Sequence, residues 1–421
     1  MDKAIYMNKL RINSLLIKVA SKCNLNCKYC YMYNLKDNSY TNQPRLMSYE
    51  TAHNVIRKVY KHCVENNISE FLFVFHGGEP LLQPKEFFID FVSFAGLVFG
   101  KETKLYFAIQ SNGSLLSNEI AELFDKLKIQ IGISLDGDKS TNDVNRLYKN
   151  GRSSYNDVII GLNNSLKFDY HKRSLGILTV INLDVDPKDT YDFFKGINVP
   201  RMDFLFPYYT WDSYPLIHRI KDNKFTPYAD WLIKIFDLWY DDKEQHPDIR
   251  MFSGFIRSFL GEEYPDDQFG CYPNSLLVVE ANGEIEPIDY LKACYEDITK
   301  TGLNINKNEI SDANMIPLIE LYYNSHKAVC SICKCCPLLS ICGGTVLPAR
   351  YSDKNGFDNV SIYCKDIVKL LVHIQNKIID SMFMLTGKDT ILTRLNYKDI
   401  IDVISKSMVK KDIVLQSFKK N

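Results

Sequence analysis

Between residues 15 and 240 the sequence alternates short β-branched or aromatic runs with stretches of helical periodicity. The strand-like runs are Leu15–Ala20, Phe71–His76, Lys104–Gln110, Gln130–Leu135, Leu175–Asn182 and Arg201–Pro207. The helical stretches are Thr51–Asn66, Pro84–Phe99, Ser117–Lys128, Tyr155–Phe168, Pro187–Lys195 and Thr226–Asp241. This alternation predicts an α/β fold with parallel strands joined by crossover helices. Six such units predict a partial (β/α)6 TIM barrel, whose active site would lie at the C-terminal ends of the strands.

The rhythm changes after about Phe255, where Gly, Pro and Cys become more frequent until Cys364. Such a region has little apolar core and is expected to need bound metal to hold its shape. Helical periodicity returns over Asp366–Ile379, and the tail beyond Thr386 also reads as helical. We therefore expect three domains: a barrel over 1–245, a Cys-rich domain over 246–375 and a helical C-terminal tail over 376–421.

Charge and hydropathy narrow the class of partner. The chain has 421 residues, and its 51 basic residues balance 51 acidic ones. This balance gives no support for a nucleic-acid or membrane-surface partner. No apolar run approaches the roughly 18 residues of a membrane span, and residues 1–10 lack the apolar core of a secretory signal. We expect a cytoplasmic protein.

The 12 cysteines are unevenly distributed: three near the start, Cys63 alone, and eight between Cys271 and Cys364. In a cytosolic chain, clustered cysteines are more often metal ligands than disulfides. Cys63 lies on the apolar stripe of its predicted helix, so we expect it to be a buried thiol.

The first cluster, Cys23-Asn-Leu-Asn-Cys27-Lys-Tyr-Cys30, directly follows the first predicted strand. Iron–sulfur cubanes normally take four thiolates, so three would leave one iron open to a small molecule. The alternatives are buried free thiols or a zinc site, which would want a fourth local Cys or His.

This motif resembles that of the radical S-adenosylmethionine (SAM) enzymes. The resemblance implies S-adenosyl-L-methionine bound at the open iron of a [4Fe–4S] cluster. It also implies reductive cleavage of SAM to a 5′-deoxyadenosyl radical that abstracts hydrogen from a substrate. An electron donor such as flavodoxin or ferredoxin would be a partner.

Polar turns follow the next three predicted strands. Gly77-Gly78-Glu79-Pro80, which alone would indicate only a tight turn, resembles the GGEP motif that binds the SAM amino group. By the same resemblance, Ser134 and Arg146 would hold the SAM carboxylate, to which the forked Arg side chain is suited. The expected SAM-binding residues are Tyr29, Gly77, Gly78, Glu79, Pro80, Ser111, Asn112, Ser134, Asp136 and Arg146.

The second cysteine region holds enough thiols for two further cubanes. Cys333, Cys336, Cys342 and Cys364 resemble the later half of the SPASM domain, which implies that they hold one auxiliary [4Fe–4S] cluster. Zinc would suit the CxxC pairs equally well.

The ligands of any second auxiliary cluster stay open. Ile288 and Val346 stand where many SPASM proteins have cysteines. The remaining candidate ligands are Cys271, Cys294, Cys330 and Cys335.

Asp289 directly follows Ile288. The resemblance to SPASM enzymes that mature sulfatases implies that Asp289 is the catalytic base. A turn-capping role is the alternative.

Longer motifs, including Gly132–Asp138, Met202–Pro207 and Gly356–Asn359, resemble the cyclophane-forming radical SAM/SPASM peptide maturases. This implies a ribosomally made precursor peptide as substrate, and a carbon–carbon link between an aromatic ring and the Cβ of a nearby residue. Formylglycine formation on a sulfatase and a zinc-stabilised binding protein without catalysis are the competing hypotheses. Epimerisation or thioether formation on a peptide is a third outcome that stays open. The aromatic segment Phe206–Pro215 would either line a peptide groove or pack against the Cys-rich region.

Overall fold

The structure is a computed structural model that describes residues 10–386 and 393–406. The chain forms two compact units that interleave along the sequence. The first unit contains residues 10–180, 197–207 and 274–323, and the second contains 181–196, 208–273 and the described residues from 324 onward. The domain boundaries expected from the sequence stay a prediction.

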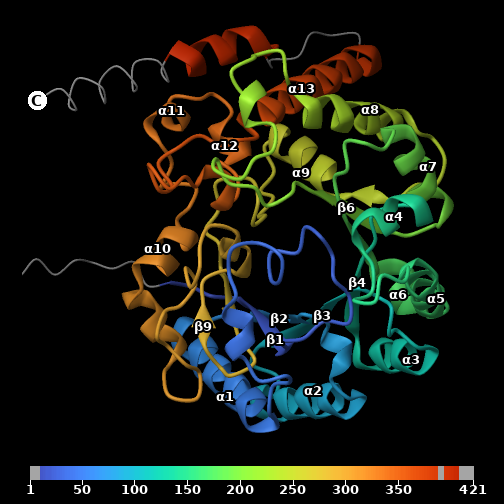
Figure 1. Cartoon of the computed structure of the whole chain (residues 1–421), viewed down its shortest axis with the longest axis vertical. Coiled ribbons are helices and arrows are strands. Elements are labelled where there is room, and N and C mark those ends of the chain that lie inside the picture. The colour runs from blue at the N-terminus through green and yellow to red at the C-terminus, as the bar shows by residue number, and fades with distance from the viewer. Residues whose placement is uncertain (1–9, 387–392, 407–421) are drawn as a thin grey trace, which may run out of the picture. The chain divides into compact units, whose positions relative to one another are not determined.

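The first unit is built on a sheet (Figure 1). Its strands are β1 (Ser14–Ala20), β2 (Glu70–Gly77), β3 (Lys104–Ser111), β4 (Ile129–Ser134), β5 (Gly176–Val180), β6 (Arg201–Leu205), β8 (Leu276–Val279) and β9 (Ile285–Glu286). They lie in the order β6-β5-β4-β3-β2-β1-β8-β9. Neighbours from β6 to β8 are parallel, and β9 is antiparallel to β8. The predicted six parallel strands are confirmed.

The helices of the first unit lie between these strands or follow the last of them. They are α1 (Tyr49–Asn66), α2 (Lys85–Phe99), α3 (Asn118–Leu127), α4 (Lys139–Asn145), α5 (Tyr155–Ser165), α6 (Asp169–Ser174) and α10 (Pro317–Tyr323), with 3-10 turns η1 (Ser39–Asn42), η2 (Pro80–Leu82), η4 (Asp289–Ala293) and η5 (Ile310–Met315). Figure 1 shows α1, α2 and α3 on one side of the strands. The expected helices in this unit are confirmed, with ends that differ by a few residues.

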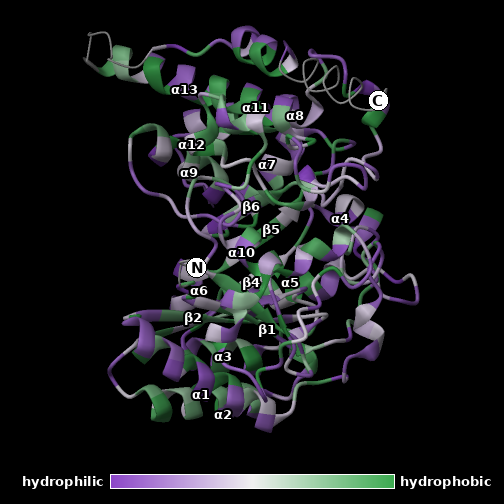
Figure 2. Ribbon diagram, turned by 90° about the vertical axis from the view of Figure 1, so that its left-hand side faces the viewer, coloured by the Kyte–Doolittle hydropathy of each residue, from purple (hydrophilic) through white to green (hydrophobic). Residues whose placement is uncertain are grey.

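Sequence patterns explain both kinds of element. In α1 the Ser48 side chain accepts a hydrogen bond from the backbone N–H of Thr51, which caps the first turn. Cys63 lies on the buried face of α1, as predicted, and burial raises the pKa of its thiol to about 12. In β2 every second residue is buried, and Figure 2 shows hydrophobic strands beside helices with one hydrophobic and one hydrophilic face.

Two short strands of the first unit were not predicted from the sequence. Strand β8 pairs in parallel with β1, with Ser14 opposite Leu276, and β9 turns back along β8. The sequence signal was the run Leu276-Leu-Val-Val279, which is too short to stand out by periodicity. This pairing brings the segment from Glu280 onward beside β1.

The second unit is mainly helical. Its elements are α7 (Pro187–Gly196), η3 (Ile217–Arg219), α8 (Pro227–Asp241), β7 (Asp248–Ile249), α9 (Arg250–Phe259), α11 (Ser331–Lys334), α12 (Leu339–Cys342), η6 (Pro348–Arg350) and α13 (Cys364–Thr386). Helix α13 confirms the predicted helix over 366–379 and extends it at both ends. Of the tail, residues 397–406 are helical, and 387–392 and 407–421 lie outside the described residues.

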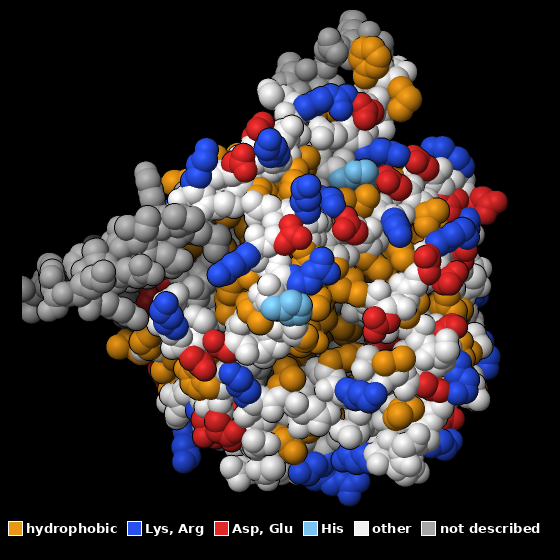
Figure 3. All heavy atoms as spheres, turned by 45° about the horizontal axis from the view of Figure 1, so that its top comes forward, with side chains coloured by type: hydrophobic (Ala, Val, Ile, Leu, Met, Phe, Trp, Pro, Cys, Tyr) orange, Lys and Arg blue, Asp and Glu red, His pale blue; other side chains and the backbone are white. Residues whose placement is uncertain are grey.

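The surface carries both signs of charge. Figure 3 shows Lys and Arg side chains interspersed with Asp and Glu over the face it displays. Among the helices that the structure describes, none has the length and apolar character to cross a membrane.

Candidate active site

The loop after β1 holds the first three cysteines. Cys23, Cys27 and Cys30 are each half-buried, and the backbone N–H of Cys30 donates to the carbonyl of Cys27 at 3.0 Å. Burial raises the pKa of Cys23 to about 12 and that of Cys30 to about 11, and the negative charge of Cys27 adds to both shifts. The three thiols therefore lie within electrostatic reach of one another, and bound metal would have to displace their protons.

Their spacing suits a cluster better than one ion. Within the described part of the chain, no three His, Cys, Asp or Glu side chains are set closely enough to hold a single metal ion. A cubane is larger than an ion, so the thiolates that hold it stand further apart. Three half-buried thiols on one loop fit that group.

Glu79 ties together the ends of β2 and β3. Its buried carboxylate accepts hydrogen bonds from the Ser111 hydroxyl at 2.8 Å and from the backbone N–H groups of Asn112 at 2.8 Å and Leu81 at 3.0 Å. Pro80 begins η2 directly after it. Glu79 therefore shapes the turn, and the expected SAM-binding residues at the two strand ends lie together.

Asp136 and Arg146 meet at Tyr29. The Tyr29 hydroxyl donates to Asp136 at 2.7 Å, and Arg146 Nη1 donates to the Tyr29 oxygen at 2.8 Å. The Nε of Arg146 is buried and has no hydrogen-bond partner among the described residues. An unsatisfied buried guanidinium N–H fits an anionic ligand such as the SAM carboxylate. Ser134, at the end of β4, accepts a hydrogen bond from Gln110 at 2.9 Å.

Asp289 is the first residue of η4 and is 2% exposed. Its Oδ2 lies 3.1 Å from the Lys18 ammonium and accepts a hydrogen bond from the Tyr31 hydroxyl at 3.0 Å. Burial raises the pKa of Asp289, but Lys18 and the other neighbours outweigh it, and the pKa is lowered overall. Since the carboxylate faces Lys18 and no side chain caps η4, the turn-capping alternative is not supported.

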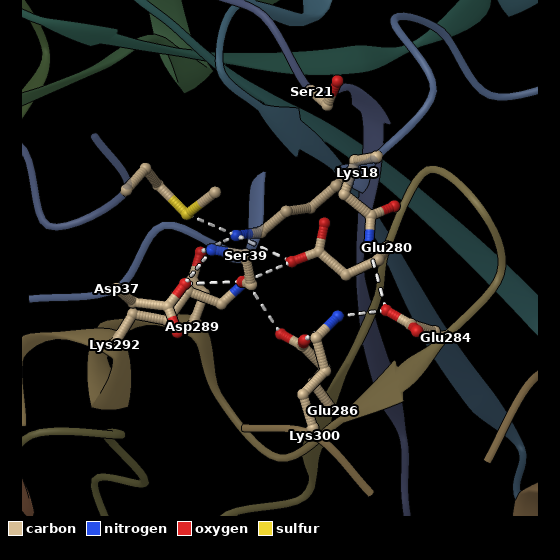
Figure 4. A network of polar contacts seen from close by, with 12 residues as sticks. Lys18, Ser21, Asp37, Ser39, Glu280, Glu284, Glu286, Asp289, Lys292 and Lys300 are labelled. Carbon is tan, nitrogen blue, oxygen red and sulfur yellow. Dashed lines mark hydrogen bonds and ion pairs between the residues drawn. The ribbon is translucent and has the colours of Figure 1, made fainter. Parts of the chain in front are cut away.

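Lys18 belongs to a buried group of charged side chains that the sequence analysis missed. The other members are Glu280 after β8, Glu286 in β9 and Lys292 in η4 (Figure 4). The one available signal was a lysine inside the apolar strand run Leu15–Ala20, because an unpaired lysine is almost never fully buried.

The second unit gathers the later cysteines around one pocket. Cys333, Cys336, Cys342 and Cys364 line a small pocket of about 20 Å³, whose other walls are mostly apolar. Burial raises the pKa of Cys336, Cys342 and Cys364. These are the four cysteines that the sequence grouped as ligands of one auxiliary cluster.

Four more cysteines were candidate ligands. Cys330 Sγ lies 3.6 Å from Cys333 Sγ, and the charge of Cys271 raises the pKa of Cys342, so both thiols stand near the pocket. Cys294 is fully buried and belongs to the first unit. Cys335 is exposed, and it is absent from the pocket lining.

The aromatic segment packs against the Cys-rich region. The indole N–H of Trp211 donates to the carbonyl of Val360 at 2.9 Å. The backbone N–H of Trp211 donates to the backbone carbonyl of Tyr351. The ring of Tyr214 meets the ring of Tyr363 edge-on at 5.9 Å. Trp211 and Tyr214 therefore show the packing considered from the sequence, and groove lining by the rest of the segment stays a prediction.

Comparison with known proteins identifies the family. A sequence model described as the Radical SAM superfamily matches residues 17–194. The cysteine-type anaerobic sulfatase-maturating enzyme of Clostridium perfringens (strain 13 / Type A) is 27% identical over 369 residues, which covers 84% of this chain and 93% of that protein. An uncharacterised protein of Methanocaldococcus jannaschii is 30% identical over 314 residues, covering 70% of this chain and 90% of that protein.

A solved structure shows the same fold. The native structure of anSMEcpe with bound AdoMet and Kp18Cys peptide has a TM-score of 0.73 and 24% identity, covering 87% of this chain and 98% of that one. This chain belongs to the radical SAM superfamily, whose enzymes use SAM and [4Fe–4S] chemistry. Membership favours an enzyme over the zinc-stabilised binding protein.

Proposed function

We propose that this protein is a radical SAM oxidoreductase that removes hydrogen from a side chain of a peptide substrate, with Asp289 as the base. The observation that carries the proposal lies on β1. This strand places Lys18 against the buried Asp289 at 3.1 Å, and the loop that follows it carries Cys23, Cys27 and Cys30. Strand β1 thus holds the ionised carboxylate of Asp289 through Lys18, and it leads into the three thiols that would bind the cluster.

Each group has a defined task in this proposal. Cys23, Cys27 and Cys30 would hold the cluster, and Arg146 with Ser134 would orient the SAM carboxylate. When bound there, SAM and its cluster would supply the radical chemistry by which the substrate loses a hydrogen atom. Asp289 then accepts a proton from the substrate, because its lowered pKa keeps it as a carboxylate at neutral pH.

A Cys or Ser side chain of a sulfatase is the first candidate substrate. Its relatives include anaerobic sulfatase-maturating enzymes of both the cysteine and the serine type. Oxidation of either side chain to formylglycine removes hydrogen from Cβ. One electron leaves with the abstracted hydrogen atom, and a second electron must leave afterwards. The thiols around the pocket in the second unit would hold the group that accepts this second electron.

A cyclophane crosslink in a precursor peptide is the second candidate. Ile288 and Val346 stand where many SPASM proteins have cysteines, and the motifs Gly132–Asp138 and Met202–Pro207 resemble the cyclophane-forming branch. Both candidate reactions remove one hydrogen atom, one proton and one electron, so the same site would serve either.

Mass spectrometry distinguishes the two. The reconstituted enzyme would be reduced anaerobically and given SAM with either a sulfatase peptide or any small peptide found to be encoded beside its gene. Formylglycine would react with a hydrazine probe. A crosslink would remove two hydrogens and block fragmentation between an aromatic residue and a residue two positions further on. If both peptides stay unchanged while SAM is cleaved, both candidates are wrong.

Asp289→Asn provides the test of the base. This change keeps the size of the side chain but removes the proton acceptor, so we expect product formation to fall by about 100-fold, the low end of what general bases contribute. SAM cleavage should continue, because Asp289 acts after hydrogen abstraction. Unchanged product formation would contradict the role of Asp289.

A further inference from the structure

A chain of charged side chains leads from Asp289 to the surface of the first unit (Figure 4). Lys18 Nζ lies 3.1 Å from Asp289 and 3.5 Å from Glu280 Oε1. Lys292 Nζ contacts both Glu280 and Glu286 and so joins their carboxyl groups. Lys300 Nζ lies 3.7 Å from Glu286 Oε1 and also bonds Glu284.

Only the outer end of this chain meets solvent. The side chains of Lys18, Glu280 and Glu286 are at most 1% exposed, whereas those of Lys300 and Glu284 are 28% and 32% exposed. Burying charges costs free energy that mutual attraction often fails to recover, so such a cluster is weak evidence for stability. Because stability does not account for these buried charges, we look for their role in the reaction.

The buried part of the cluster has one carboxylate more than it has cations. Lys18 and Lys292 contribute two positive charges, against three negative charges from Glu280, Glu286 and Asp289. His76 Nδ1 lies 3.9 Å from Asp289, but burial lowers the pKa of His76, so it adds no charge at neutral pH. Like charges held together in a buried site favour retention of a proton by one carboxyl group. The cluster can therefore carry a proton.

Glu286 is the member that binds this proton most readily. Burial and the negative charge of Glu280 raise its pKa to about 7, although Lys292, Lys18 and Lys300 act in the opposite direction. The pKa of Glu280 is lowered, since Lys18 and Lys292 outweigh its burial. Lys292 Nζ lies 2.5 Å from Glu280 and 3.1 Å from Glu286, so it holds the two carboxyl groups in place.

We propose that Lys18, Glu280 and Glu286 form a proton-exit relay, which carries the proton collected by Asp289 to Lys300, Glu284 and solvent. The proposal rests on the proposed function, in which Asp289 takes that proton. Protonated Asp289 gives its proton to Lys18 as Lys18 gives one to Glu280, so the ammonium keeps its charge. The proton passes from Glu280 to Glu286 by the same exchange at Lys292, which takes up one proton as it gives another. It then leaves through Lys300 and Glu284, which restores ionised Asp289. No electron moves in these steps.

The test uses Glu286→Gln, which keeps the shape of the side chain but cannot take up a proton. One anaerobic reaction yields two readings: 5′-deoxyadenosine, which reports hydrogen abstraction, and modified peptide, which also requires proton loss. We expect modified peptide per 5′-deoxyadenosine to fall by about tenfold, less than the loss of the base itself because water still exchanges slowly with the cluster. 5′-Deoxyadenosine release should persist, and would show that the variant is folded.

The matched control is Asp37→Asn. Asp37 is also buried in the first unit, but its carboxylate bonds Ser39 and the backbone N–H of Asp297. This control should keep the wild-type ratio. A Glu286→Gln ratio equal to that of wild type would overturn the relay while leaving the proposed function intact.

The pH dependence adds a second criterion. Glu286 must be ionised to accept a proton, so the wild-type ratio should rise as pH increases through about 7, and the Glu286→Gln ratio should stay flat. The relay alone would be refuted by two results together. Asp289→Asn would lose peptide modification, and the ratio in Glu286→Gln would still rise with pH as it does in wild type. An Asp289→Asn variant that modifies peptide normally would instead refute the proposed base.

Infrared spectroscopy tests the relay without any substrate. The wild-type enzyme should show the C=O stretch of a protonated carboxyl group that disappears as pH rises through neutrality. Burial also raises the pKa of Asp366 in the second unit to about 7, so the wild-type band contains both carboxyl groups. Glu286→Gln should remove the Glu286 part of the band and keep the Asp366 part, and Asp37→Asn should keep both. A spectrum without such a band in wild type, or one unchanged in Glu286→Gln, would overturn the proposal.

Discussion

At the scale of single residues, the turn after β2 leaves no space for side chains. A Cβ on Gly78 would lie 2.3 Å from the backbone oxygen of Lys22 and 2.0 Å from the Tyr33 hydroxyl. Gly77 has φ +131°, and a Cβ there would lie 2.1 Å from the oxygen of Ala20. The loop that carries the first cysteines therefore packs directly on this glycine pair, which no longer side chain would permit.

Gly78→Ala should destabilise the first unit. Overpacking of this kind costs about 1–3 kcal/mol. Gly96→Ala is the matched control, because Gly96 lies within α2 with no atom within 4 Å of its would-be Cβ. It should instead stabilise the protein by about 0.5–1 kcal/mol. Urea unfolding of the apoprotein measures both, and equal midpoints for the two variants would contradict this account.

Some residues of the site could be identified from the sequence, and others could not. Cys23, Cys27 and Cys30 could be predicted because three thiols at fixed spacing after a strand carry their own chemical signal. Lys18 and Glu286 could not, because their importance comes from partners far away in sequence. A buried charge is recognised only when the strand pairing that surrounds it is known.

At the scale of elements, a helix after α13 closes the cysteine pocket of the second unit. Ile404, which is 3% exposed, lines this pocket together with Cys364. The Tyr397 hydroxyl donates to the carbonyl of Asn223 at 2.7 Å, and the Asn223 amide donates to the Ser405 hydroxyl at 3.3 Å. These contacts hold residues 397–406 over the thiols.

Ile404→Asp should open the pocket. An unpaired carboxylate is costly in apolar surroundings, so the helix should detach. We expect labelling of Cys364 by a thiol reagent in the apoprotein to accelerate at least about tenfold, the effect of about 1.4 kcal/mol. Val403→Asp is the control, because Val403 on the same helix is 50% exposed. Equal labelling rates in the two variants would contradict this role of the helix.

The elements themselves were largely predictable. The six parallel strands and their helices follow from hydrophobic periodicity, which local sequence carries. Strands β8 and β9 were missed because four and two residues give no period, and only pairing with β1 makes them strands. They matter for the site, since they bring Glu280, Glu286 and Asp289 to Lys18.

At the scale of the whole molecule, the two compact units divide the cysteines. The first unit holds Cys23, Cys27 and Cys30 together with the Asp289 network, and the second holds the pocket lined by Cys333, Cys336, Cys342 and Cys364. Each unit is assembled from separate stretches of the chain, which a scan along the sequence for domain boundaries does not reveal. Loss of the cysteines in one unit should therefore leave the cysteines of the other unit able to bind iron.

The most direct measurement of the central claim is SAM cleavage by wild-type enzyme and by Cys27→Ala, each reconstituted with iron and sulfide and reduced anaerobically. The account predicts that wild type releases 5′-deoxyadenosine. Cys27→Ala should release none, yet keep the iron bound at the second thiol group. The central claim would be contradicted if iron-loaded wild type released no 5′-deoxyadenosine, or if Cys27→Ala released it at the wild-type rate.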